Sequence, residues 1–165
     1  MDELLPTGPA WLGWIGVGYA AFLIAIAIYD VRRRRVPNVA IYPAIAAATG
    51  LAFVRGDGEW WSFVLAGLGA GVFFAALAWI HPGSMGGGDI KLAALVGLMA
   101  GWPDVVVAIF VAFAVGATVG VILVGLGRLG RRDPLPFAPA LAVGALTAAV
   151  AGHQVVATLW PGLTT

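Results

Sequence analysis

Long stretches without a single charged residue dominate this 165-residue sequence. A helix that spans a membrane needs about 20 apolar residues, within a range of roughly 17 to 25. Five uncharged stretches reach this length, namely Leu4 to Tyr29, Val36 to Val54, Trp60 to Gly88, Val105 to Gly127 and Pro134 to Thr165. A sixth, Leu92 to Pro103, is shorter. The pattern predicts an all-α membrane protein, built as a bundle of six transmembrane helices.

The short stretch from Leu92 to Pro103 is the fourth along the chain. Its 12 residues would rise only about 18 Å as a helix, against a hydrocarbon core of about 30 Å. We therefore expect the glycines before it, Gly86, Gly87 and Gly88, to form a loop that starts inside the bilayer. Irregular backbone is tolerated at membrane depth where it lines a protein or water-filled cavity, and glycine permits positive φ and close approach.

The composition supports a membrane environment and excludes several classes of function. Hydrophobic residues make up 61% of the chain and charged residues 10%, whereas about a quarter of the residues in an ordinary soluble domain are charged. A net charge of +1 gives no basic excess for binding nucleic acid. The absence of cysteine excludes disulfides, a thiolate nucleophile and cysteine-based zinc sites. His81 and His153 lack ligand spacing, so we expect no metal site. No cofactor is expected either.

The positions of the basic residues predict a topology. If the N-terminus lies outside, eight of the nine basic residues fall inside, and only Arg55 stays outside. This asymmetry is the one that the positive-inside rule requires. The first span lacks a basic segment before it and is expected to be retained rather than cleaved as a signal peptide. Because the linkers between spans are short, residues 1–165 are predicted to form one domain.

Two aspartates stand where a membrane chain tolerates them least. Asp30 ends the first apolar run, and Asp89 follows the three glycines. An acidic side chain at the centre of a membrane helix costs roughly 2.5 to 3.5 kcal/mol, so each is a functional candidate. Two spans separate them, which places both on the same, cytoplasmic side. Taken singly, Asp30 could instead pair with the adjacent arginines, and Asp89 could cap the fourth helix.

Paired carboxylates have a defined chemistry. Two like charges a few ångströms apart do not both ionise readily, so the pair shares a proton. One carboxylate can then take a proton from water while the protonated partner donates a hydrogen bond to a scissile carbonyl. This is general acid–base hydrolysis without a metal or a covalent intermediate. The sequence leaves open which aspartate acts first as the base.

Three motifs in the chain resemble, in the same order, the signatures of the type IV prepilin peptidase family, the bacterial GxGD aspartyl proteases. They are Asp30 with Arg35-Val36-Pro37-Asn38, then Gly86-Gly87-Gly88-Asp89-Ile90-Lys91-Leu92, then Pro136-Phe137-Ala138-Pro139-Ala140-Leu141. By this resemblance Asp30 and Asp89 match the catalytic aspartates, and the glycines, together with Lys91, match the loop that positions the second one. The supporting residues are Arg35, Pro37, Asn38, Pro136 and Pro139.

The resemblance implies a peptidase of the bacterial inner membrane that removes the basic leader from prepilins or related pseudopilins at the cytoplasmic face. Its expected partners are that substrate and the lipid bilayer. The paired-cysteine domain of the long family members has no counterpart here, so we expect the short, peptidase-only form without methyltransferase activity. The presenilin and signal-peptide-peptidase group shares part of the motif set, but six spans favour the prepilin family.

Several alternatives stay open at the level of sequence. A small transporter or proton-pathway protein would also place two aspartates within a bundle, and a catalytically silent pilus-assembly protein would retain the same fold. Lys91 either tunes the charge of Asp89 or extends to the membrane interface. Asn38 either helps to start the second span or contacts substrate. The oligomeric state is not determined.

Overall fold

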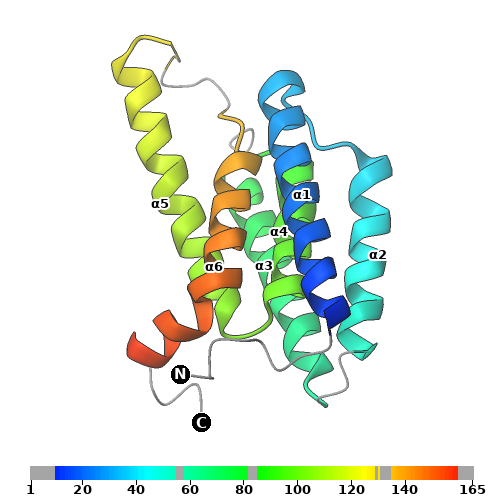
Figure 1. Cartoon of the computed structure of the whole chain (residues 1–165). Helices are drawn as coiled ribbons and strands as arrows, with labels where there is room; N and C mark the ends of the chain where they lie inside the picture. The colour runs from blue at the N-terminus through cyan, green and yellow to red at the C-terminus, as the bar shows by residue number, and fades with distance from the viewer. Residues whose placement is uncertain (1–9, 55–57, 82–84, 129, 131–134, 160–165) are drawn as a thin grey trace.

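The computed structural model describes residues 10–54, 58–81, 85–128, 130 and 135–159. The described residues form six α-helices and no strand, which confirms the all-α prediction (Figure 1). In chain order the helices are α1 (Ala10–Arg33), α2 (Asn38–Val54), α3 (Trp60–Ile80), α4 (Gly87–Ala100), α5 (Asp104–Gly125) and α6 (Ala138–Leu159).

Four of these helices, α1, α3, α5 and α6, are long and apolar enough to cross a membrane. The apolar helix α2 has 17 residues and is shorter than these spans. The 14 residues of α4 correspond to a rise of about 21 Å, which confirms that the fourth helix is short. The structure therefore shows an all-helical bundle with four candidate spans, while the count of six spans stays a prediction.

The helices pack in pairs that small residues bring close together. The two tightest pairs are α3 with α4 and α5 with α6. At Gly97 in α4, an added Cβ would collide with the backbone of Ala66 and lie 2.7 Å from the Cα of Gly67. At Gly144 in α6, it would collide with the backbone carbonyl of Ala108. Since a membrane bundle gains its cohesion largely from close packing, these glycines set the distance between the paired helices.

The helices α1 and α2 pack less extensively than the two tightest pairs. α1 packs against α6, and α2 packs against α4 and α3. No Cα atom of α1 lies within 8 Å of one in α2 or α4. Large apolar side chains such as Val17, Leu65 and Phe110 are exposed around the bundle, as expected for surfaces that face lipid.

Successive helices run in alternating directions along the bundle (Figure 1). The last turn of α1 and the first turns of α4 and α6 consequently lie at the same end, which we call the aspartate end because Asp30 and Asp89 belong to these turns. The prediction that two intervening helices return the chain to the side of Asp30 is thus confirmed. Trp60, Trp61 and Trp102 are exposed at the opposite end, where α3 begins and α4 leads into α5.

Candidate active site

Asp30 is buried near the C-terminal end of α1, with 5% of its surface exposed. Its Oδ2 accepts a hydrogen bond of 3.3 Å from the backbone N–H of Ala138, the first residue of α6. The first turn of a helix presents free N–H groups and the positive end of the helix dipole, so it is a favourable partner for a carboxylate. The neighbouring arginines, by contrast, are exposed. The structure therefore favours contact with α6 over the alternative that Asp30 pairs with the arginine cluster.

Asp89 is also buried, with 9% of its surface exposed, and lies in the first turn of α4. The N–H of Gly86 donates to Asp89 Oδ2 at 3.2 Å, and the N–H of Asp89 donates to the carbonyl of Gly86 at 3.0 Å. Gly86 occupies the N-cap position. The alternative of Asp89 as the N-cap is therefore wrong, because its side chain instead reaches back from the third helical position, as in a capping box.

The prediction that Gly86, Gly87 and Gly88 form a loop is also wrong for two of the three glycines. Gly87 and Gly88 belong to α4, and only Gly86 precedes the helix, in an extended conformation with φ −80° and ψ 149°. The described glycines with positive φ are Gly58, Gly101 and Gly127. Close approach does explain Gly88, because an added Cβ would lie 2.7 Å from the Cβ of Val36. The first turn of α4 thus abuts the segment between α1 and α2.

The two aspartates face a common region without direct contact between their backbones. Their Cα atoms are more than 8 Å apart, since no Cα of α1 comes closer to α4. Asp30 and Asp89 belong to two helix ends that lie on the same side of the bundle.

Lys91 is held by α2 rather than by Asp89. Its Nζ donates a hydrogen bond of 2.8 Å to Oδ1 of Asn38 and lies 4.7 Å from the centroid of the Tyr42 ring. Asn38 is the first residue of α2, and the carbonyl of Pro37 accepts hydrogen bonds from the first turn, so both residues lie at the start of this helix. Arg35 is exposed between the two helices.

The third motif anchors the start of α6. Pro136 and Pro139 are half-buried on either side of Ala138. The ring of Phe137 packs against Phe74 and Phe113, with centroid distances of 5.9 and 5.3 Å. This aromatic cluster holds the N–H of Ala138 where Asp30 can accept from it. Residue identities predict only a supporting role for this motif, because a donor on the main chain leaves no signal in residue identity.

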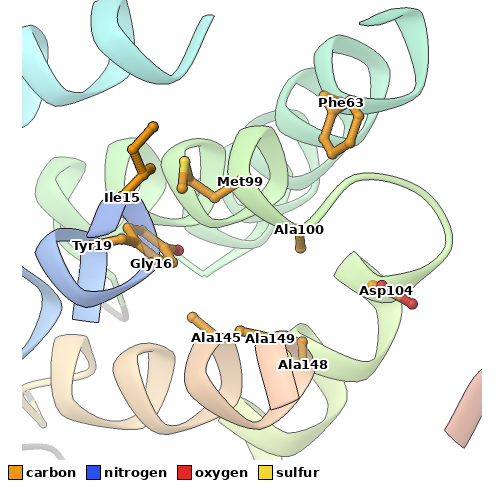
Figure 2. A pocket seen from close by; sticks show the side chains of 10 residues that line it. All are labelled: Ile15, Gly16, Tyr19, Phe63, Met99, Ala100, Asp104, Ala145, Ala148 and Ala149. Carbon is orange, nitrogen blue, oxygen red and sulfur yellow. The ribbon is translucent and has the colours of Figure 1, made fainter. Parts of the chain in front are cut away.

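A second polar feature lies at the opposite end of the bundle. Figure 2 shows Tyr19 and Asp104 on two sides of a cavity of about 280 Å³. Tyr19 Oη and Asp104 Oδ1 are both buried, and neither has a hydrogen-bond partner among the residues that the structure describes. Neither Asp30 nor Asp89 lines this cavity, so it is separate from the candidate active site.

Comparison with known proteins gives one consistent result. A family model described as the type IV leader peptidase family matches residues 17–121, which include Asp30 and Asp89. A prepilin leader peptidase/N-methyltransferase of Bacillus subtilis is 34% identical over 143 residues, covering 85% of this chain and 56% of the relative. The protein of the same name from Pseudomonas aeruginosa is 31% identical over 142 residues, covering 82% and 49%.

A prepilin leader peptidase/N-methyltransferase of Burkholderia pseudomallei is 26% identical over 142 residues, covering 83% of this chain and 46% of the relative. The chain therefore spans about half the length of the curated relatives that it matches. No solved structure shows a significant match.

Proposed function

Because this chain belongs to the type IV leader peptidase family, we propose that it is an aspartyl endopeptidase that removes leader peptides from prepilins or related pseudopilins. The observation that carries this proposal is the pair of buried aspartates at the same end of a bundle of apolar helices. Buried carboxylates that repel each other are suited to sharing one proton.

In the proposed reaction, the ionised aspartate takes a proton from a water molecule as the water oxygen attacks the scissile carbonyl carbon. The protonated aspartate donates its proton to the carbonyl oxygen, which gives a neutral tetrahedral intermediate. The aspartate that took the proton from water then gives it to the nitrogen as the C–N bond breaks. The other aspartate takes a proton from a hydroxyl group of the intermediate, so the pair again holds a single proton and each aspartate is in its starting state. The backbone N–H groups of Ala138 and Gly86 hold one oxygen of each carboxylate during this cycle.

We further propose six spans, counting α2 and α4, with the N-terminus outside and the aspartate end toward the cytoplasm of a bacterial inner membrane. Four apolar helices support membrane insertion, and the arginines after Asp30 support this orientation. At the cytoplasmic end, the aspartates could receive a leader peptide without its translocation.

The purified protein, incubated with a cognate prepilin and without any gradient across a membrane, should yield a shortened product that mass spectrometry identifies. Asp30→Asn and Asp89→Asn should each lower turnover about a thousandfold or more, because each removes a group that transfers a proton. The double variant should be no worse than either single one, since the two groups act as a unit.

Asp104→Asn is the matched control, because it makes the same change at the opposite end of the bundle. It should leave cleavage close to that of the parent protein. Near-normal turnover by Asp30→Asn or Asp89→Asn would contradict the shared-proton mechanism. A complete lack of cleavage by the parent protein, with several prepilins, would contradict the proposed activity itself.

A further inference from the structure

The distance between Asp30 and Asp89 is not set by direct packing of the helices that carry them. α1 packs against α6, and no Cα atom of α1 lies within 8 Å of one in α4. Two routes connect the aspartates instead. One runs through α6, whose Ala138 binds Asp30 and which also packs against α4. The other runs along the chain from Asp30 through residues 34–37 into α2, which packs against α4.

The second route ends in contacts around Asp89. On one side of Asp89, Gly88 abuts Val36, with 2.7 Å between an added Cβ and the Cβ of Val36, and 3.3 Å to the backbone nitrogen of Val36. On the other side, half-buried Lys91 donates its hydrogen bond to Asn38. The turn that carries Asp89 is thus held at two points, by Val36 just before α2 and by Asn38 at its start.

Asn38 and Tyr42 together form the receiving surface for Lys91. They are four residues apart in α2, so their side chains lie on the same face of the helix, one turn apart. The ammonium group donates to Asn38 Oδ1 at 2.8 Å and lies over the Tyr42 ring at 4.7 Å from its centroid. A cation above an aromatic face gains electrostatic energy from the ring quadrupole. A hydrogen bond and a cation–π contact therefore restrain the same ammonium group.

We propose that Asn38 and Tyr42 hold Lys91 and thereby position Asp89 relative to Asp30. Asn38, Tyr42 and Lys91 are positioning residues in this scheme, and none of them takes part in proton transfer. The inference deepens the proposed function, on which its catalytic consequence rests. Its geometric content, the distance between two side-chain positions, can be measured without any peptidase activity.

Cross-linking provides that measurement, because the chain contains no cysteine. An Asp30→Cys, Asp89→Cys variant would be treated with bifunctional methanethiosulfonates of increasing length. A direct disulfide is not expected, since it needs Cα atoms roughly 4.4 to 6.8 Å apart and these are more than 8 Å apart. Adding Asn38→Ala or Lys91→Met should lower the yield with the shortest effective linker at least about threefold, by uncoupling α4 from α2.

Four further variants separate positioning from general destabilisation. Lys91→Arg keeps a cation that can donate to Asn38 and stack on Tyr42, so it should retain most of the cross-linking. Tyr42→Leu should lower the yield, whereas Tyr42→Phe should not, because the contact uses the ring face. Val39→Ala alters a side chain that is 89% exposed on the same turn of α2, and it should have no effect.

Peptidase kinetics supply the second readout. Asn38→Ala and Lys91→Met should each lower kcat about tenfold with little change in KM, and the double variant should resemble the single ones. If Asn38→Ala and Lys91→Met change neither the cross-linking yields nor kcat, the proposal is overturned. The distance between Asp30 and Asp89 would then be set through α6. If the parent protein cleaves no prepilin, the proposed function fails, while the cross-linking yields still decide whether these residues position Asp89.

Discussion

Gly88 brings the backbone of α4 against the segment that leaves α1. The contact is with Val36, six residues after Asp30, so a single residue without a side chain lets the second aspartate approach the part of the chain that carries the first. Glycine in a helix costs roughly 0.5 to 1 kcal/mol relative to alanine. Two consecutive glycines in the first turn of α4 therefore lower the stability of the helix. At Gly88, the close approach of Val36 explains why a residue without a side chain is present.

Gly88→Ala and Gly87→Ala form a matched pair of neighbouring substitutions. A Cβ at position 88 would lie 2.7 Å from the Cβ of Val36, whereas one at position 87 would meet nothing within 4 Å. Gly88→Ala should displace the turn that carries Asp89 and lower cleavage at least about tenfold, because small displacements of catalytic groups are costly. Gly87→Ala should retain activity, with equal or higher thermal stability.

Val36→Gly combined with Gly88→Ala should restore part of the lost cleavage, because it removes the Val36 Cβ and Cγ2 that lie 2.7 and 2.9 Å from the added Cβ. The measurements are initial rates of prepilin cleavage and thermal unfolding midpoints in detergent. Equal rates for the two single variants would show that the contact with Val36 has no bearing on the site.

At the scale of elements, the first turns of two helices support the two carboxylates. The first residue of α6 donates its N–H to Asp30, and Asp89 bonds the N-cap of its own helix. Burial alone would disfavour ionised carboxylates, and the dipoles of α4 and α6 oppose that effect. The pairing of α3 with α4 then holds α4, a short helix, in place within the bundle.

Gly97→Ala should destabilise this pairing. Its Cβ would collide with the backbone of Ala66, which cannot move aside as a flexible side chain can. Overpacking of this kind costs about 1 to 3 kcal/mol, which should lower the thermal unfolding midpoint measurably. Gly69→Ala on α3 is the control, because its Cβ would meet nothing within 4 Å. A midpoint unchanged by Gly97→Ala would contradict the close approach of α3 and α4.

At the scale of the whole molecule, alternating helix directions decide which residues share an end. Asp30, Asp89 and Ala138 come together because an even number of helices lies between the helix ends that carry them. The cavity between Tyr19 and Asp104 lies at the other end. One membrane face of the protein would thus hold the proposed peptidase site, and the opposite face the separate cavity.

Single cysteines in this cysteine-free chain test that arrangement. Glu59→Cys, at the start of α3, and Arg128→Cys, after α5, are exposed at opposite ends of the bundle. In intact cells, an impermeant maleimide should label Glu59→Cys, and Arg128→Cys should react only after permeabilisation. Labelling of both residues from the same side would contradict the proposed topology.

The sequence by itself determined the class of the fold and the two candidate catalytic residues. Apolar stretches of spanning length require helices in a membrane, because backbone groups must be satisfied within each segment. Asp30 and Asp89 were identifiable because acidic residues are costly at that depth, and the count of intervening stretches predicted their common end.

Only the tertiary structure decided how the two aspartates are held. The donor to Asp30 is a backbone N–H of Ala138, and Lys91 is bound by Asn38 and Tyr42 rather than by Asp89. Gly87 and Gly88 proved to be helical. These features depend on contacts between residues far apart in the chain and on main-chain groups that nearly all residues share. Local patterns of hydrophobicity or charge encode neither the contacts nor the main-chain donors.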